Sequence, residues 1–140
     1  MLLKDYIPKV NKLYSKTYFS GVSFDSSKVR KNNIFFAIKG NRFDGNNFIN
    51  KAIKKGAKII ISEKKFTKKK SNIIFLHSLN TRRLLSQVSY KILNEKPKKL
   101  IAVTGTNGKS SIADFYFQIL KLNKKKVASI GTLGKKKFQI

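Results

Sequence analysis

Apolar residues along the chain form short runs that alternate with helical stripes. The runs are rich in β-favouring residues and predict buried strands at residues 34–38, 58–62, 72–76 and 127–130. The stripes repeat every three or four residues and predict helices that begin near Asn46, Thr81 and Ser110. Because strands and helices alternate, the sequence predicts an α/β fold, with a further strand at residues 100–103 parallel to the one at residues 127–130 and joined to it by a right-handed crossover.

Shorter patterns predict the remaining boundaries. Apolar residues at helical spacing predict a short N-terminal helix that ends near Pro8. Alternating apolar and polar residues at 22–25 predict a first strand. Asn46 or Asn47 can cap the helix that follows the second strand, and Gly56 suits its C-terminal end.

Two polar stretches interrupt the pattern and suggest how the chain is divided. Residues 64–70 form a charged link between two predicted strands, and residues 94–99 (N-E-K-P-K-K) form the best linker candidate. We therefore expect one domain at residues 1–97 and the beginning of a second at residues 98–140.

The most informative stretch runs from a predicted strand at residues 100–103 into a helix. Gly105 and Gly108 let the backbone fold tightly, so that its N–H groups and the helix N-terminus can face a phosphate. Lys109 would reach the β and γ phosphates of a nucleotide, and the Ser110 hydroxyl would ligate Mg²⁺.

This stretch matches the pattern G-x-x-x-x-G-K-[ST] incompletely, because Val103 stands where the first Gly belongs. The alternative interpretation is an ordinary strand-to-helix turn with a solvated Lys. The strand before it and the helix after it favour nucleotide binding, because the motif requires both.

A second polar stretch follows the first two predicted strands. Residues 24–29 and 38–47 would present Asp, Ser, Asn and Arg side chains at strand ends, together with an Asp-Gly turn. From spacing alone, ordinary turn chemistry explains these residues.

Composition narrows the function classes. The chain has 32 Lys and Arg against 6 Asp and Glu, a balance typical of nucleic-acid binding. However, the Lys residues are spread along the chain and only four basic residues are Arg, the residue that base readers favour; they are Arg30, Arg42, Arg82 and Arg83. A solvated Lys surface is the better interpretation, with no specific nucleic-acid partner.

The remaining composition excludes several kinds of site. There is no Cys, and hence no disulfide or thiolate metal site, which fits a reducing compartment. The sole His, His77, has no second ligand at metal spacing and is expected to be structural. No apolar stretch approaches the length of a membrane span, so we expect a cytoplasmic protein without a membrane partner.

Two sets of motifs resemble the Mur ligase family. The stretch V-T-G-T-N-G-K-S at residues 103–110 resembles its ATP loop, in which the first Gly is normally absent. The motifs D-S-x-K-V, F-x-A-I-K-G, D-G-x-x-F-I and A-x-x-x-G-A, within residues 25–57, resemble its N-terminal domain. The resemblance covers nearly the whole chain. Within the family, S-I-G-T-L-G at residues 129–134 is most similar to the branch that adds meso-diaminopimelate as the third residue.

The resemblance implies a small N-terminal α/β substrate domain, followed by the truncated start of a parallel-sheet ATP-binding domain. It places ATP on Gly105, Thr106, Asn107, Gly108, Lys109, Ser110 and Ser111. Among these, it gives Lys109 a catalytic role and Ser110 the Mg²⁺. It places the uridine diphosphate end of the substrate near Phe24, Ser26, Asn41, Arg42, Phe43, Asp44 and Gly45.

One residue departs from the family pattern. The family usually reads D-S-R where this chain has Ser27. A contact that the family's Arg makes is therefore not expected at Ser27 of this chain. Lys28 or Arg30 would supply the charge, but neither places a planar fork at position 27.

The implied reaction is ATP-dependent amide ligation through an acyl phosphate. The partners would be a UDP-N-acetylmuramoyl peptide and an amino acid, and the cofactors ATP and Mg²⁺. The 140 residues alone are expected to be inactive, because a P-loop domain needs further strands and a second Mg²⁺ carboxylate. The alternatives are the ligase that adds D-alanyl-D-alanine, a basic nucleic-acid-binding module and a generic P-loop NTPase.

Overall fold

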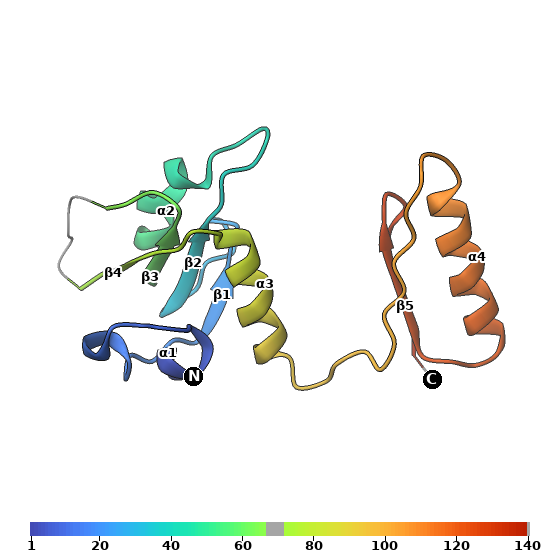
Figure 1. Cartoon of the computed structure of the whole chain (residues 1–140), viewed down its shortest axis with the longest axis horizontal. Helices are drawn as coiled ribbons and strands as arrows, with labels where there is room; N and C mark the ends of the chain where they lie inside the picture. The colour runs from blue at the N-terminus through green and yellow to red at the C-terminus, as the bar shows by residue number, and fades with distance from the viewer. Residues whose placement is uncertain (67–71, 140) are drawn as a thin grey trace. The chain divides into compact units, whose positions relative to one another are not determined.

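The structure, a computed structural model, describes residues 1–66 and 72–139. The chain forms two compact units, Met1–Lys96 and Pro97–Ile140 (Figure 1). Most of the charged link expected at residues 64–70 lies outside the described residues. None of the helices in the described part of the chain is long and apolar enough to cross a membrane.

The first unit is built on a parallel four-stranded sheet. Its strands are β1 (Gly21–Ser23), β2 (Asn33–Ala37), β3 (Ala57–Ser62) and β4 (Ile74–His77). They lie side by side in the order of the sequence, and each neighbouring pair is parallel. This confirms the predicted α/β class and the four predicted strands of this unit.

Helical segments connect and cover the strands of this sheet. They are α1 (Leu3–Tyr6), η1 (Lys12–Tyr14), η2 (Gly45–Phe48), α2 (Ile49–Lys54) and α3 (Thr81–Ile92). The predicted helices near residues 3, 46 and 81 are therefore confirmed.

Strand β2 forms the centre of the core, because all five of its residues are buried. Side chains alternate between the two faces of a strand. Ile34 and Phe36 accordingly pack with Leu3 of α1 and Val88 of α3. Phe35 and Ala37 belong to a second cluster, which includes residues of α2. The sheet is thus buried on both faces, as parallel sheets usually are.

The cap predicted for the helix after the second strand is wrong by two or three residues. Asp44, rather than Asn46 or Asn47, is the N-cap of η2, and its side chain accepts a hydrogen bond from Asn46 N. The Asp carboxylate precedes the turn and competes better for the first N–H group than an Asn already within it. Gly56 has φ +103°, which confirms that it ends α2 in a conformation suited to glycine.

The second unit contains α4 (Lys109–Leu122), β5 (Val127–Gly131) and β6 (Gly134–Phe138). The helix and β5 agree with the sequence prediction. The two strands, however, form an antiparallel hairpin through a two-residue turn.

The predicted strand at residues 100–103 and its parallel pairing with β5 are wrong for this structure. Residues 101–104 have no regular secondary structure, and 87 % of Leu100 and 55 % of Ile101 are exposed. Strand β5 pairs instead with β6, and closing a two-residue turn costs little conformational entropy. Apolar alternation could not reveal β6, because three of its five residues are Lys.

Candidate functional site

Two groups of predicted site residues follow neighbouring strands of the parallel sheet. Phe24 and Ser26 come after β1, and residues 41–45 come after β2. Because β1 and β2 are parallel and adjacent, both segments leave the sheet at its carboxyl edge. This edge is where ligands bind in open α/β sheets. We call these two segments the edge loops.

The edge loops present apolar rings beside polar groups. Phe24 is 67 % exposed and Phe43 is 71 % exposed, whereas Ser26 is buried. Exposed aromatic rings can stack on a planar base. Asn41 and Arg42 are exposed beside Phe43.

The second edge loop is a tight turn closed by its own backbone. Gly40 N donates to Phe43 O at 2.9 Å, and Gly45 N donates to Ile38 O at 2.9 Å. A Cβ at Gly45 would lie 2.6 Å from Ile38 O and 2.7 Å from Ile38 N, both backbone atoms. The turn therefore requires glycine at this position.

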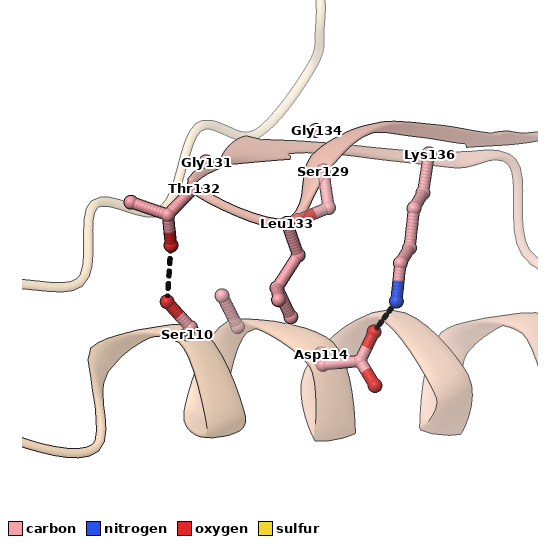
Figure 2. Close-up of a pocket in the computed structure, with 9 residues that line it drawn as sticks. Ser110, Asp114, Ser129, Gly131, Thr132, Leu133, Gly134 and Lys136 are labelled. Atoms are coloured by element: carbon pink, nitrogen blue, oxygen red, sulfur yellow. Dashed lines mark hydrogen bonds and ion pairs between the residues drawn. The ribbon is translucent and has the colours of Figure 1, made fainter.

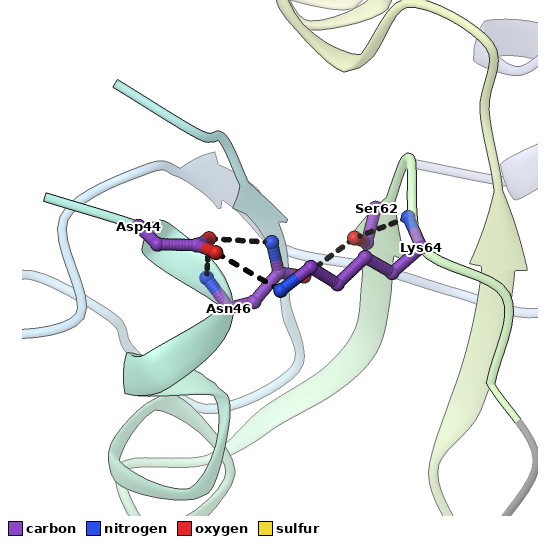
Figure 3. Close-up of polar contacts among 4 residues, drawn as sticks. All are labelled: Asp44, Asn46, Ser62 and Lys64. Atoms are coloured by element: carbon purple, nitrogen blue, oxygen red, sulfur yellow. Dashed lines mark hydrogen bonds and ion pairs between the residues drawn. The ribbon is translucent and has the colours of Figure 1, made fainter. Parts of the chain in front are cut away.

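Asp44 anchors the end of this loop through a polar network (Figure 3). Its Oδ1 accepts from Asn46 N at 2.9 Å and from Asn46 Nδ2 at 2.6 Å. Lys64 Nζ donates to Oδ2 at 3.0 Å, and Ser62 Oγ donates to Asn46 Oδ1 at 2.6 Å. The hydrogen bonds from Asn46, followed by that from Lys64, lower the pKa of Asp44 to about 2. The carboxylate is therefore charged at neutral pH.

The first edge loop is held by a Lys that sequence reasoning did not single out. Lys55 Nζ donates to Ser27 O at 2.7 Å from the end of α2. Ser27 donates its N–H and its hydroxyl to Asp25 Oδ1, and these bonds lower the pKa of Asp25. Ser27 therefore stabilises the turn itself. Only the fold could reveal Lys55, because it lies 28 residues away in sequence.

His77 has a structural contact at the same edge. Its Nε2 lies 3.1 Å from Glu63 O. In the described residues, no three His, Cys, Asp or Glu side chains come together as a metal site.

The predicted phosphate loop (residues 105–111) leads into α4 and contains two glycines with positive φ. Gly105 has φ +143° and Gly108 has φ +75°, conformations that other residues rarely adopt. Gly108 is the N-cap of α4 and supplies no side chain to satisfy the first N–H groups. These groups have no partner within the helix and suit an anion.

Lys109 points into its own loop. Its Nζ donates to Gly105 O and, at 2.8 Å, to Thr106 O. Two carbonyl dipoles of the loop thus hold the ammonium group against the loop backbone. A phosphate arriving there would meet a cation already in place.

Ser110 contacts the hairpin rather than the loop (Figure 2). Its Oγ lies 2.7 Å from Thr132 Oγ1. It is also the only predicted site residue that lines a pocket of about 20 Å³ between α4 and the hairpin. The other lining residues are Ala113, Asp114, Ser129, Gly131, Thr132, Leu133, Gly134 and Lys136. A pocket of this size holds about one water molecule, so it is not itself a nucleotide site.

The residues of the phosphate loop fit a Mg²⁺–nucleotide. A hydroxyl oxygen suits Mg²⁺, which takes one or two protein ligands and completes its shell with phosphate oxygens and water. Ser110 supplies such an oxygen at the N-terminus of α4, where phosphates would also lie.

Comparison with known proteins identifies the family. Residues 18–91, more than half of the chain, match the "Mur ligase family, catalytic domain". This chain belongs to the Mur ligase family. The match lies within the first unit and includes both edge loops.

Relatives of this Mur ligase chain extend the similarity to the second unit. The UDP-N-acetylmuramoyl-L-alanyl-D-glutamate–2,6-diaminopimelate ligase of Rickettsia prowazekii is 40 % identical over 125 residues, 89 % of this chain and 26 % of the relative. The ligase of the same name from Rickettsia bellii is 40 % identical over 134 residues, 95 % of this chain and 27 % of the relative. The first unit has only 96 residues, so both alignments reach beyond it.

Solved structures of Mur ligases are also similar. A structure of the diaminopimelate ligase of the same name has a TM-score of 0.73 and 26 % identity, and the alignment covers 98 % of this chain and 28 % of that one. The Thermotoga maritima MurF ligase in complex with ADP has a TM-score of 0.58 and 30 % identity, and covers 75 % and 24 % of the two chains. The chain thus spans about a quarter of the length of its relatives.

Proposed function

We propose that the chain is part of the Mur ligase that joins diaminopimelate to UDP-N-acetylmuramoyl-L-alanyl-D-glutamate in peptidoglycan precursor synthesis. The observation that carries this proposal is the 40 % identity to ligases of this name over 89 % of the chain. The similarity covers both the edge loops and the phosphate loop, and we assign the edge loops to the UDP-peptide and the phosphate loop to ATP.

The edge loops are proposed to bind the uridine diphosphate end of the peptide substrate. Phe24 and Phe43 offer exposed rings for the uracil base. Arg42 offers an exposed planar cation for a phosphate, and Ser26 offers a buried hydroxyl. Asp44 and Gly45 hold the loop that carries Arg42 and Phe43.

The phosphate loop is proposed to bind ATP. Backbone N–H groups at the start of α4 would face the phosphates, and Lys109 would exchange its loop carbonyls for phosphate oxygens. Bound Mg²⁺ would offset phosphate charge, with the Ser110 hydroxyl as its protein ligand. ATP and the UDP-peptide are thus proposed to bind to separate groups of residues.

The proposed chemistry has two steps. A carboxylate oxygen of the peptide substrate attacks the γ-phosphorus of ATP, the bond to the ADP oxygen breaks, and an acyl phosphate forms. The diaminopimelate amine then attacks the acyl carbon, inorganic phosphate leaves, and the amine loses a proton. Lys109 would stabilise the phosphoryl group during its transfer, a role of positioned positive charge.

Chemical-shift mapping on the ¹⁵N-labelled 140-residue chain tests both sites at once. UDP-N-acetylmuramoyl-L-Ala-D-Glu is expected to shift the amides of residues 24–26 and 41–45. ATP with Mg²⁺ is expected to shift those of residues 105–111. Shifts scattered over the Lys residues, with a steep dependence on salt, would indicate nonspecific anion binding instead.

A matched pair of Arg variants separates specific binding from net charge. Arg42→Ala is expected to weaken binding of the UDP-peptide by about tenfold, because it removes a charge-assisted hydrogen bond. Arg83→Ala removes the same charge from an exposed position on α3 and is expected to have little effect. Equal losses in the two variants would contradict the proposed site.

A second candidate is the ligase that adds D-alanyl-D-alanine. The similarity to the UDP-N-acetylmuramoylalanyl-D-glutamyl-2,6-diaminopimelate–D-alanyl-D-alanyl ligase of Acinetobacter baumannii, at 26 % identity and a TM-score of 0.56, favours it. Titration with the UDP-muramoyl tripeptide, the substrate of that ligase, decides between them. Tighter binding of the tripeptide than of the dipeptide would favour the second candidate.

A further inference from the structure

The hairpin of the second unit is tied to α4 at two points (Figure 2). Thr132, the first residue of the β5–β6 turn, places its Oγ1 2.7 Å from Ser110 Oγ. Lys136 of β6 forms an ion pair with Asp114, one turn further along α4. The contact at Thr132 involves the residue proposed to ligate Mg²⁺, whereas the contact at Asp114 does not.

We propose that Thr132 is a positioning residue that orients the Ser110 hydroxyl for the divalent cation. This inference rests on the proposed function, because it assigns a role at the same nucleotide site. Ser110 is partly buried against the hairpin, and Thr132 Oγ1 is the partner of its hydroxyl. The turn thus fixes which way the hydroxyl points.

The direction of the proton follows from the chemistry of the hydroxyl. A Ser hydroxyl has one proton and two lone pairs. A cation needs a lone pair and repels the proton, so the proton must point away from the metal. If Ser110 donates to Thr132 Oγ1, the proton lies on the hairpin side and both lone pairs of Ser110 remain available. Partners that orient metal ligands in this way change metal affinity strongly.

The side chain and the turn at position 132 suit this role. Thr is β-branched, so its χ1 angle is restricted and Oγ1 is held in place. The turn is narrow, since Gly131 and Gly134 pair directly across it. The Lys136–Asp114 ion pair holds the hairpin independently of Thr132. Removing the Thr132 hydroxyl is therefore expected to leave the hairpin on the helix.

The test measures how much Mg²⁺ strengthens binding of ADP to the 140-residue chain. ADP affinity is determined calorimetrically in EDTA and in excess Mg²⁺, for the wild type and for Thr132→Val and Thr132→Ser. Thr132→Val keeps the shape but removes the acceptor, and is expected to reduce the effect of Mg²⁺ by about tenfold. Thr132→Ser keeps the hydroxyl and is expected to retain most of the Mg²⁺ effect. Affinity for metal-free ADP is expected to stay unchanged in both variants.

A matched control and a second readout separate positioning from packing. Lys136→Gln breaks the other tie of the hairpin and is expected to leave the effect of Mg²⁺ unchanged. Electron paramagnetic resonance with Mn²⁺ and ADP measures metal retention directly, and Thr132→Val is expected to release more free Mn²⁺ than Thr132→Ser.

The outcomes show whether the role of Thr132 fails alone or whether the proposed ATP site fails with it. If the wild type shows a Mg²⁺ effect that Thr132→Val retains, the role of Thr132 is wrong and the ATP site stands. An equal loss of the Mg²⁺ effect in Thr132→Val, Thr132→Ser and Lys136→Gln would instead indicate that Thr132 only packs the hairpin. A parallel loss of affinity for metal-free ADP would indicate the same. If the wild type binds no ADP, or binds it without a Mg²⁺ effect, both the proposed ATP site and the role of Thr132 fail.

Discussion

Lys109 donates hydrogen bonds to two carbonyl groups of its own loop. In the proposed ATP complex, phosphate oxygens replace these carbonyl groups. Lys109→Ala is expected to weaken ATP binding by tenfold or more, because it would remove the proposed charged contact with phosphate, a contact of about 1.5–3 kcal/mol. The residue is exposed, so the melting temperature is expected to change little. Calorimetric titration with ATP and Mg²⁺ measures the first quantity and a thermal melt the second.

Lys125→Ala is the matched control for this experiment. It removes the same charge from an exposed position in the turn after α4. Unchanged ATP affinity in Lys109→Ala, or an equal loss in Lys125→Ala, would show that the loop does not bind phosphate through Lys109.

Asp44 makes stability depend on pH in a defined window. Its pKa is about 2 in the folded chain, against about 3.9 in an unfolded chain, so the unfolded state binds the proton more tightly. The stability from Asp44 is therefore fully present above pH 4 and is lost as the pH falls towards 2. We expect the melting temperature of Asp44→Asn to lie below that of the wild type at pH 6, and the difference to vanish near pH 2.

Thermal melts between pH 2 and 6 measure this difference. Glu95→Gln removes an equal charge from an exposed position and serves as control. A gap between Asp44→Asn and the wild type that stays constant across this range would contradict the assignment of the hydrogen bonds to the carboxylate.

At the scale of the elements, the turn between β2 and η2 leaves no room for a side chain at Gly45. Gly45→Ala would place a Cβ within 2.7 Å of two backbone atoms of Ile38, so the turn or the end of β2 must shift. We expect a loss of about 1–3 kcal/mol in the free energy of unfolding, by analogy with overpacked sites. Denaturant unfolding measures it, with Gly21→Ala as control. At Gly21 the nearest atom to the new Cβ belongs to the Asn33 side chain, at 3.4 Å, so a larger loss there than at Gly45 would refute this explanation.

The elements also show how far the sequence alone determines the fold. The apolar runs of β2 and β3 and the stripe of α3 were predictable, because burial in the core requires their spacing. Strand β6 was not, because its Lys residues lie on an exposed hairpin that burial does not constrain. The predicted strand at residues 100–103 failed for a related reason: β-propensity forms a strand only where a partner strand pairs with it.

The candidate site divides in the same way. Lys109 and Ser110 could be placed at the start of a helix, since the glycines and the apolar stripe are local signals. Whether they bind ATP stays a prediction. The contacts of Lys55, Lys64 and Thr132 bridge 20 or more residues, so local patterns could not reveal them.

At the scale of the whole molecule, α4 exposes an apolar stripe. Ile112, Phe115 and Ile119 lie at helical spacing and are 55–63 % exposed. Exposed apolar stripes of this kind favour association. We expect the chain to self-associate as its concentration rises, and the double variant F115K/I119K to be more nearly monomeric. Sedimentation velocity over a concentration series measures this.

A Lys substitution elsewhere controls for the added charge. Leu13 is 78 % exposed in η1 of the first unit, apart from any such stripe. Leu13→Lys is therefore expected to leave self-association unchanged. If it reduces association as much as F115K/I119K does, or if the wild type stays monomeric, the stripe is not an association surface.

The complete burial of β2 has a kinetic consequence. Its amides lie between two hydrogen-bonded neighbours, β1 and β3, and under side chains on both faces. Such amides exchange their hydrogens with deuterated solvent only when the whole unit opens. Strand β5 has one strand neighbour and no fully buried residue, so a local fluctuation exposes its amides. Deuterium uptake should therefore proceed in two phases. The hairpin amides exchange in the fast phase, and the β2 amides exchange in a slow phase whose rate reports the opening of the parallel sheet.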